Sequence, residues 1–274
     1  MSAVEKEFTM REEDFDFLAD LAYSTSGIVL GEHKKELLYS RIARRIRALK
    51  LTSFSDYCSY IQSHQEQELS NFLNSITTNL TSFFRESHHF EFLAKELVPE
   101  FKKRSSSQPI RVWSSASSTG QEPYSIAITL YKHLNASHKN VKILATDLDS
   151  NVLNKGRSGE YSLDEIEQMP RDYLRYFERN ERAGVGRVKQ DIRDMIQFNR
   201  LNLLGPWPIK VQFDVVFCRN VVIYFNKETQ KQLFTRLADQ IVDGGYLIIG
   251  HSESLVGMEK RFRACGRTIY QKIG

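Results

Sequence analysis

Apolar side chains recur at helical spacing through the first 86 residues, where no run alternates as a half-buried strand does. Spacings of three and four residues place such side chains on one face of an α-helix. The clearest stripes consist of Phe15, Leu18, Ala19 and Ala22, and of Leu38, Ile42, Ile46 and Leu49. Ser53 can cap a further helix. The pattern therefore predicts an all-α region at the start of the chain.

The pattern changes after residue 110, where strand-like and helix-like runs alternate. Residues 110–113 form a short β-type run, and a small polar loop leads to Glu122-Pro123, which opens a helix. Proline suits the first turn of a helix because the amide that it lacks would have no partner there. A second strand, residues 141–145, leads to Asp147. This order predicts an α/β fold with a parallel sheet.

The same alternation returns near the C-terminus. The expected elements are a buried strand at 213–218, a helix at 230–242 ended by Gly244-Gly245, a strand at 246–250 and a hairpin over 261–273. Residues 161–200 depart from this order. We interpret part of them as an insertion that forms a small β subdomain.

Asp147 predicts a nucleoside-containing cofactor, because ligands bind at the carboxyl ends of parallel strands and an acid there can accept both hydroxyls of a ribose. A pyrophosphate would require a G-x-G-x-x-G loop. The loop here has only Gly120, and Glu122 places a negative charge where phosphates would lie. S-adenosylmethionine, which is cationic and has no phosphate, fits better than NAD or FAD. A ligand-free βαβ unit remains the alternative.

Composition narrows the class of protein. The 274 residues are 41% hydrophobic and 26% charged, with a formal net charge of +4, as expected of a soluble globular protein. No apolar run is long enough to cross a bilayer, and the N-terminus, MSAVEKEF, is charged. The cysteines, Cys58, Cys218 and Cys265, lie far apart and form no metal-ligand pair. They favour a reducing, cytoplasmic setting.

Positive charge is concentrated on one predicted helix. Its arginines are Arg41, Arg44, Arg45 and Arg47. No acid lies between Arg41 and Lys50 to compensate them, so this surface suits a polyanion such as nucleic acid, acidic lipid or a glutamate-rich helix. An ordinary solvated helix face is the alternative.

Five motifs in this order resemble those of the chemotaxis receptor methyltransferases, the CheR family. They are TTNLTSFFRESHHF (77–90), STGQEPYSIA, ATDLD, LNLL and FCRNVVIYF, and the likeness covers nearly the whole chain. The resemblance implies a class I S-adenosylmethionine methyltransferase (Rossmann-like) domain with an N-terminal all-α domain and a small β subdomain insertion. The implied ranges are 1–76 for the helical domain, 77–90 for a linker and 91–274 for the methyltransferase domain, with the insertion at about 170–198.

The resemblance also implies the site residues. Those expected at the cofactor are Asn79, Thr81, Arg85, Glu122, Asp147, Asn202, Leu203, Arg219 and Asn220. Arg85 and Tyr224 are the expected catalytic residues, and the four arginines of the charged helix are the expected substrate contacts. One departure is visible, since Gln121 stands where the family usually has a first glutamate. Arg85 as a structural ion pair and Tyr224 as a core residue remain the alternatives.

The implied reaction transfers a methyl group from S-adenosylmethionine to glutamate carboxylates of chemoreceptor helices, leaving S-adenosylhomocysteine. A glutamate is already ionised at neutral pH, so the reaction needs no general base. Anion and cation neutralise each other in this displacement, so a tight arginine–carboxylate pair would stabilise the ground state more than the transition state. We therefore expect Arg85 to orient the substrate, and alignment and desolvation to supply most of the acceleration.

The expected partners are receptors with acidic coiled coils, to which a cytoplasmic monomer would be recruited at the inner membrane. We expect no nucleic-acid partner, no membrane insertion and no metal. Adjacent residues on a helix point apart, so we interpret His88 and His89 as structural. Two other functions stay open: a nucleic-acid methyltransferase, although residues 218–221 lack the usual prolines, and a non-catalytic cofactor-binding sensor. Some family members also dock a receptor peptide through the insertion, for which the turn at 179–187 looks short.

Overall fold

The computed structural model describes residues 6–105, 107–134, 140–255, 257–258 and 260–273, so part of the charged N-terminus lies outside the description. Its contacts divide the chain into two compact units. The helical unit comprises the residues up to Thr78 together with Tyr224–Asn226, and the sheet unit comprises the rest. No helix among the described residues is both long and apolar enough to cross a membrane.

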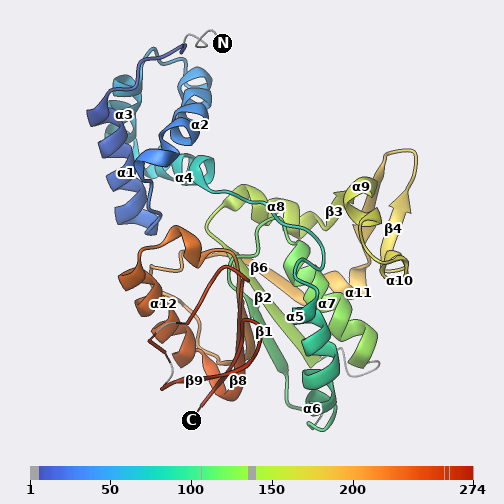
Figure 1. The fold of residues 1–274 in the computed structure, drawn as a ribbon. Helices are drawn as coiled ribbons and strands as arrows, with labels where there is room; N and C mark the ends of the chain where they lie inside the picture. The colour runs from blue at the N-terminus through green and yellow to red at the C-terminus, as the bar shows by residue number, and fades with distance from the viewer. Residues whose placement is uncertain (1–5, 106, 135–139, 256, 259, 274) are drawn as a thin grey trace. The chain divides into compact units, whose positions relative to one another are not determined.

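The helical unit consists of short helices around one apolar core. They are α1 (Glu12–Ser26), η1 (Glu32–Lys34), α2 (Lys35–Ala48), α3 (Phe54–Ser63) and α4 (Gln65–Ile76), drawn in blue to cyan in Figure 1. Most residues of the predicted stripes are buried, with Leu18, Ile42 and Ile46 fully enclosed, whereas Ala19 and Leu49 are half-buried. Ser53 caps α3 as expected, because its Oγ accepts a hydrogen bond from the amide of Asp56 at 3.0 Å. The predicted all-α region is confirmed.

The sheet unit is built on a seven-stranded sheet. In spatial order its strands are β6 (Ile196–Arg200), β2 (Val141–Asp147), β1 (Ile110–Ser114), β7 (Phe213–Cys218), β8 (Ile241–Ile249), β10 (Ile269–Lys272) and β9 (Phe262–Gly266). The first five are parallel, and β9 and β10 form the predicted antiparallel hairpin at the edge.

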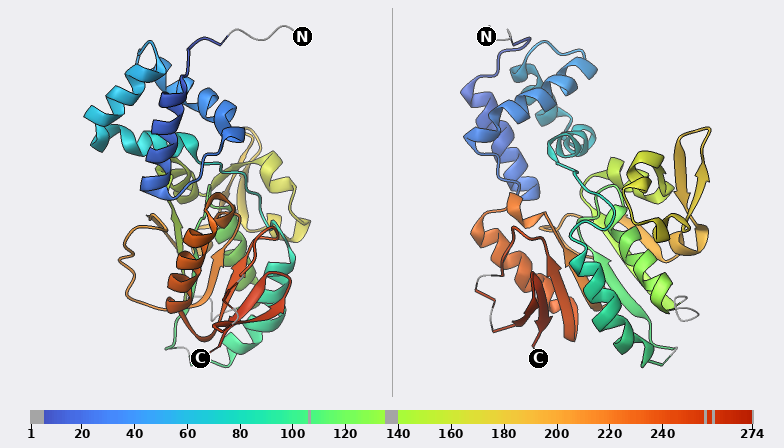
Figure 2. Two further views of the ribbon diagram at one scale, coloured as in Figure 1. Left: turned by 60° about the vertical axis from the view of Figure 1, so that its left-hand side comes forward. Right: turned by 45° about the vertical axis from the view of Figure 1, so that its right-hand side comes forward.

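Helices cover both faces of this sheet (Figures 1 and 2). One side carries α5 (His88–Phe92), η2 (Leu93–Leu97), α6 (Val98–Lys102) and α7 (Gln121–Leu134), and the other carries α12 (Lys227–Asp239); α8 (Ser150–Ser158) and α11 (Gln190–Arg193) precede β3 and β6. Right-handed crossovers explain the division. The connection from β1 to β2 runs toward one edge of the sheet and that from β7 to β8 toward the other, so α7 and α12 lie on opposite faces.

The strand order reverses between β1 and β7. From β1 the chain moves to β2 and then β6, and it returns to the other side of β1 with β7. In open α/β sheets this switch point opens a crevice beyond the carboxyl ends of the strands, where ligands bind. The fold therefore predicts a site near Ser114, Asp147 and Cys218, the last residues of β1, β2 and β7.

The insertion forms a second, three-stranded antiparallel sheet, as expected, but its bounds differ. It consists of β3 (Glu160–Ser162), β5 (Val185–Val188) and β4 (Phe177–Asn180), with the short helices α9 (Leu163–Glu167) and α10 (Arg171–Leu174). The sheet thus begins about ten residues before the expected start near 170. The expected end near 198 lies within β6 of the main sheet, because β6 pairs with β2 from Ile196 onward.

Gly244-Gly245 does not end a helix, contrary to the expectation. The helix α12 stops at Asp239, and both glycines lie inside β8. Gly244 has a φ of +78°, and the pairing of β7 with β8 shifts register beside it. Phe213 pairs with Ile241 but Val215 pairs with Tyr246, so β8 has extra residues here, and a glycine with positive φ accommodates the irregular backbone. At Gly245 an added Cβ would lie 2.9 Å from the carbonyl oxygen of Asp214, so this position requires glycine for close approach.

Candidate active site

Asp147 ends β2, where a carboxylate is expected to bind a ribose. Its Oδ2 accepts a hydrogen bond from the amide of Ser118 at 2.8 Å, and its Oδ1 accepts one from the amide of Asp149 at 3.0 Å. The residue is only 9% exposed. This burial raises the pKa of Asp147 to about 6, although the amide donors act in the opposite direction. A carboxylate has about four acceptor positions, so positions remain for two hydroxyl donors.

Glu122, in the first turn of α7, forms a buried ion pair with Arg219. Arg219 follows β7, is 5% exposed, and donates from Nη1 to Glu122 Oε2 at 2.8 Å. The hydroxyl of Ser114 donates to Oε1 at 2.7 Å. Burial raises the pKa of Glu122, while the charge of Arg219 and the bond from Ser114 lower it. The pair ties the start of α7 to the end of β7 across the switch point.

The segment after Thr78 is fixed to the same strand ends. Asn79 Nδ2 donates to Asp149 Oδ2 at 2.9 Å, and the hydroxyl of Ser118 donates to the carbonyl oxygen of Asn79 at 3.0 Å. Arg219 Nη2 donates to the carbonyl oxygen of Arg85 at 2.5 Å. The structure thus brings Asn79 and the backbone of Arg85 to the edge that carries Asp147 and Glu122.

The side chain of Arg85 is half-buried, and its Nη1 donates to the carbonyl oxygen of Leu80 at 2.8 Å. Thr81 lies inside the loop that this bond closes, and it is half-buried too. The bond holds the guanidinium against its own loop and leaves its other donors for a ligand. Contact of Arg85 or Thr81 with cofactor stays a prediction.

Asn202 and Leu203 follow β6 at this edge of the sheet. The amide of the preceding residue, Leu201, donates to the carbonyl oxygen of Asp147 at 2.9 Å. Asn202 Oδ1 accepts a bond from the amide of Leu204 at 2.9 Å, and Leu203 is buried. The structure brings both residues beside β2, and their expected role at the adenosine stays a prediction.

Glu253 is a functional candidate that the sequence analysis missed. Its carboxylate accepts four backbone hydrogen bonds of 2.6–3.0 Å, from the amides of Gly250, Asn220, Val221 and Val222. Burial raises the pKa of Glu253, and the four amides oppose that shift. This carboxylate fixes the loop after β7, in which Asn220 adopts a φ of +57°. The available signal was an acid just beyond a buried strand, the same signal that identified Asp147.

Glu86 was also missed, and it joins the linker to the loops after β7 and β8. Its Oε1 accepts a bond from Asn220 Nδ2 at 3.3 Å and lies 3.0 Å from His251 Nδ1, while Oε2 accepts one from the amide of His251 at 3.1 Å. Burial alone would raise the pKa of Glu86, but the bond from His251 and the charge of Arg219 hold it below its usual range.

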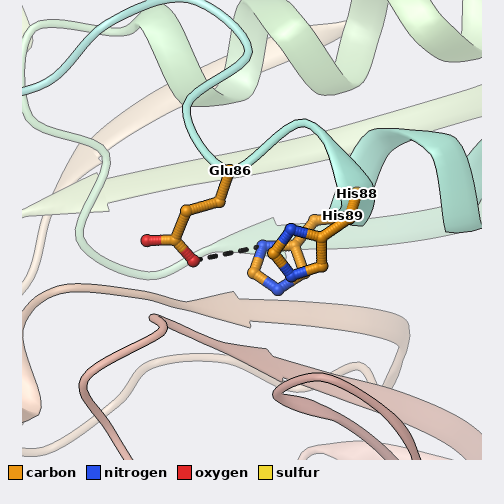
Figure 3. A group of neighbouring side chains, drawn as sticks. All are labelled: Glu86, His88 and His89. Atoms are coloured by element: carbon orange, nitrogen blue, oxygen red, sulfur yellow. Dashed lines mark ion pairs between the residues drawn. The ribbon is translucent and has the colours of Figure 1, made fainter.

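His88 and His89 do not point apart, contrary to the expectation. Their ring centroids lie 4.0 Å apart, and His89 Nδ1 is 3.7 Å from Glu86 Oε2 (Figure 3). The reason is that α5 begins only at His88, so the helical rule for neighbours does not yet govern this turn. Burial, together with the charges of Arg219 and His88, lowers the pKa of His89 to about 3.

The four arginines of α2 have two kinds of environment: Arg41 and Arg45 are bonded within the helical unit, and Arg44 and Arg47 are exposed. Arg45 makes two bonds to the buried Glu68 at 2.8 and 2.7 Å, and Arg41 Nη1 donates to the carbonyl oxygen of Thr77 at 2.6 Å. Arg44 and Arg47 are exposed, and Arg47 bonds only to the exposed Glu7 among the described residues. Acids distant in sequence therefore compensate part of the charge, and Arg44 and Arg47 remain available to a partner.

Tyr224 ends the short 3₁₀ helix η4 (Val222–Tyr224) and belongs to the helical unit by its contacts. Its carbonyl oxygen accepts a bond from the amide of Val29 at 2.9 Å, and Lys34 Nζ lies 5.3 Å from its ring centroid. Its role at the methyl group stays a prediction.

The strand ends suit S-adenosylmethionine better than a phosphate-containing cofactor. The acids are Glu122, Asp147 and Asp149, and an anionic pyrophosphate would be repelled by them. Ser117 Oγ and Arg219 Nε are buried there, and no described residue forms a hydrogen bond with either atom. Buried polar groups usually have partners, so these two atoms fit the polar groups of a bound ligand.

Comparisons with known proteins agree with this geometry. Residues 79–271 match the model of the CheR methyltransferase, SAM binding domain, and residues 13–77 match that of the CheR methyltransferase, all-alpha domain. Chemotaxis protein methyltransferase 2 of Pseudomonas aeruginosa is 42% identical over 270 residues, covering 97% of this chain and 95% of the relative. The chemotaxis protein methyltransferase of Escherichia coli is 41% identical over 266 residues, covering 95% and 91%.

These matches confirm the expected fold class, with its all-α N-terminal domain, and the expected cofactor. The chain belongs to the CheR family of S-adenosylmethionine-dependent methyltransferases, which act in chemotaxis.

Proposed function

We propose that this methyltransferase esterifies glutamate side chains on the cytoplasmic helices of chemoreceptors. The sulfonium methyl carbon bonds to a carboxylate oxygen as its bond to sulfur breaks, which leaves a neutral methyl ester and S-adenosylhomocysteine. The relatives carry the name chemotaxis protein methyltransferase, and receptors are the proposed substrates here.

The observation that carries the proposal is the state of the acids at the strand ends. Glu122 is paired with Arg219, Asp147 accepts two amide bonds, and Glu253 accepts four. Glu122 and Glu253 are held by their donors, and we assign the remaining acceptor positions of Asp147 to the ribose hydroxyls, so none of the three is proposed as a general base. A substrate carboxylate is already ionised at neutral pH, so it is the nucleophile that such a site serves best.

Arg85 and Tyr224 are the proposed catalytic residues. Arg85 already donates to the carbonyl oxygen of Leu80, so it has donors left to orient a carboxylate without neutralising it fully. We expect Arg85→Lys to keep measurable turnover for this reason. A complete loss with intact cofactor binding would contradict a positioning role. Tyr224 would present its ring or hydroxyl to the sulfonium, an attraction of about 0.5–2 kcal/mol if the ring faces the cation.

The proposed substrate surface is narrowed to the exposed pair Arg44 and Arg47. Both lie on the outer side of α2, away from the buried stripe of Leu38, Ile42 and Ile46. A glutamate-rich receptor helix complements this charge. Because both arginines are exposed, salt should weaken the attraction.

His251 supports one competing function, methylation of an amine or hydroxyl. Its Nδ1 lies 3.0 Å from Glu86 Oε1, and the side chain is 64% exposed, as in a histidine general base oriented by a carboxylate. The two functions differ in what they require of this residue. In the proposed reaction, His251→Gln keeps kcat within about threefold, whereas the loss of a general base costs about a hundredfold or more.

The deciding experiment transfers labelled methyl from S-adenosylmethionine to the organism's own chemoreceptor-containing membranes and then applies mild alkali. Volatile methanol released by base supports a carboxyl methyl ester. Label that stays on the protein after alkali contradicts it and points to N- or S-methylation. Asp147→Ala serves as the control with weakened cofactor binding. Absence of label with the wild-type enzyme and active membranes would favour a cofactor-binding sensor instead.

A further inference from the structure

Glu86, His88 and His89 bring three metal-ligating groups together beside Arg219, at the proposed cofactor site. One ligand atom from each lies within 4.8 Å of the other two. Figure 3 shows the two rings side by side, with the Glu86 carboxylate directed at them. The group lies in the linker and the first turn of α5, and the expected role of His88 and His89 is only structural.

The tautomer of His89 follows from its neighbours. The hydroxyl of Thr268 donates to the carbonyl oxygen of Arg267 at 2.7 Å, so its proton is committed. His89 Nε2 lies 2.9 Å from Thr268 Oγ1, and with the hydroxyl proton on the carbonyl of Arg267 we assign the proton of this bond to Nε2. His89 Nδ1 is then left with a lone pair. This atom is fully buried and forms no hydrogen bond within the described part of the chain.

That lone pair faces a carboxylate oxygen, which is an unfavourable pairing of two acceptors. His89 Nδ1 and Glu86 Oε2 are 3.7 Å apart. A buried acceptor without a donor costs about 1–3 kcal/mol, and a cation between the two atoms removes that cost. His88 Nε2 is a second buried imidazole nitrogen for which the described residues provide no partner.

We propose that Glu86 Oε2, His88 Nε2 and His89 Nδ1 bind a divalent transition-metal ion such as Zn²⁺. Two imidazoles and one carboxylate with an open fourth position form a ligand set that zinc accepts, at about 2.0–2.2 Å per bond. Tetrahedral ligands at that distance are about 3.3 Å apart, so Glu86 and His89 are nearly in place. One ring nitrogen of His88 lies within 4.8 Å of the other two ligand atoms, so a small shift of this half-buried side chain completes the set.

The surroundings of the ligands support this assignment. A metal-binding histidine usually donates its other ring N–H to an acceptor, and Thr268 Oγ1, 2.9 Å from His89 Nε2, is in place to accept it. The carboxylate is in turn held through Oε1 by Asn220 Nδ2 at 3.3 Å and through Oε2 by the amide of His251 at 3.1 Å. A carboxylate oxygen has two lone pairs, so Oε2 keeps one for the metal. Imidazole ligands select zinc, cobalt, nickel or copper, and exclude Mg²⁺ and Ca²⁺, which prefer oxygen.

Metal binding would be coupled to the cofactor through Arg219. Arg219 Nη2 lies 3.6 Å from Glu86 Oε2, and the same guanidinium donates from Nη1 to Glu122. A dication at Oε2 repels Arg219 and competes for the carboxylate. The structure thus predicts that the metal weakens S-adenosylmethionine binding and, by linkage, that the cofactor weakens metal binding by the same factor.

The test titrates the full-length, tag-free protein with Co²⁺ and follows visible d–d absorption, with Zn²⁺ as a competitor. We expect one Co²⁺ bound and displaced by Zn²⁺. We also expect His88→Gln to bind at least tenfold more weakly. His33→Gln, which changes an exposed histidine of the helical unit, is the matched control and should bind like the wild type. Cys265→Ser excludes binding by the exposed thiol.

Two results would overturn the proposal: no d–d band at millimolar Co²⁺, or equal affinity in the wild type and His88→Gln. Glu86→Gln is the second variant, in case changes at His88 or His89 prevent folding, and equal Co²⁺ affinity there counts against the site as well. The coupling is tested separately by calorimetry, in which Zn²⁺ should weaken S-adenosylmethionine binding in the wild type and leave it unchanged in His88→Gln.

Discussion

Arg219 and Arg44 are the same residue type in opposite environments, one in each unit of the molecule. Arg219 is buried at the switch point of the sheet and bonds to Glu122 and to the carbonyl oxygen of Arg85. Arg44 is exposed on α2. A buried charge depends on its partner, because removing one member leaves the other unpaired in a low-dielectric interior. An exposed charge is screened by water and salt. The comparison therefore assigns Arg219 to the integrity of the site and Arg44 to encounter with a partner.

Arg219→Met should have the largest effect. Loss of the guanidinium leaves Glu122 buried without its partner, which costs about 3–5 kcal/mol in the free energy of unfolding. S-adenosylmethionine binding should fall by at least a hundredfold. Denaturant unfolding and calorimetry measure the two effects. The double variant Glu122→Gln/Arg219→Met should regain most of the stability but not the binding. If the double variant is as unstable as Arg219→Met alone, the unpaired charge of Glu122 is not the cause of the lost stability.

Asp147 should make cofactor binding depend on pH. Burial raises its pKa to about 6 in the free protein, and the ribose hydroxyls donate to the ionised carboxylate. Affinity for S-adenosylmethionine should therefore be constant above pH 7 and decline as pH falls through 6, by about tenfold per pH unit once the acid is protonated. Calorimetry between pH 5 and 8 measures this. Asp147→Asn should bind about 10–100-fold more weakly and lose this pH dependence; if the dependence persists in this variant, another group is responsible.

Arg45 and Arg44 repeat the contrast between a paired and an exposed arginine within one helix, α2. Arg45 pairs with Glu68, which is buried, whereas Arg44 is exposed. The two bonds of Arg45 to Glu68 are 2.8 and 2.7 Å long. Arg45→Ala should lower the free energy of unfolding by about 1.5–3 kcal/mol, the range for hydrogen bonds to charged groups. Arg44→Ala on the same helix should change it by less than about 0.5 kcal/mol. Equal effects in thermal or denaturant unfolding would contradict the distinction between the two arginines.

Reversing the exposed charges of α2 should have the smallest effect of these substitutions. It should change KM for the receptor and leave stability nearly unchanged. Arg44→Glu/Arg47→Glu should raise KM for receptor membranes by about three- to tenfold at low salt, with kcat and stability nearly unchanged. The difference from the wild type should disappear in 0.5 M salt, because exposed charges are screened there. A salt-independent difference would mean that these arginines act through structure and not through electrostatic attraction.

The parts of the site that follow from local sequence were predictable. Asp147 was identified because a buried strand leads directly to it, and the helix of Glu122 was identified by its proline. Glu253 was missed because its role depends on the amides of residues 220–222, which reach it only through the pairing of β7 with β8. Arg45 and Glu68 are 23 residues apart in the chain, so no local pattern shows their ion pair.

The remaining errors have the same origin. Gly244-Gly245 follows a helical stripe and resembles a helix end, but the register shift and close approach that require glycine there exist only in the paired sheet. The expected range of about 170–198 leaves out β3, because this strand has only three residues, Glu160–Ser162. A strand of that length carries too few alternations to be distinguished from a loop.

The discontinuity of the helical unit limits how its gene can be divided. Tyr224–Asn226 belong to this unit although residues 79–223 separate them from Thr78 in the sequence. The amide of Val29 bonds to Tyr224, and Asn226 Nδ2 bonds to the hydroxyl of Tyr23 at 2.8 Å. A recombination crossover after codon 78 would exchange the helices without this second segment. Chimeras between relatives should therefore work best when codons 224–226 are inherited from the same parent as the first 78.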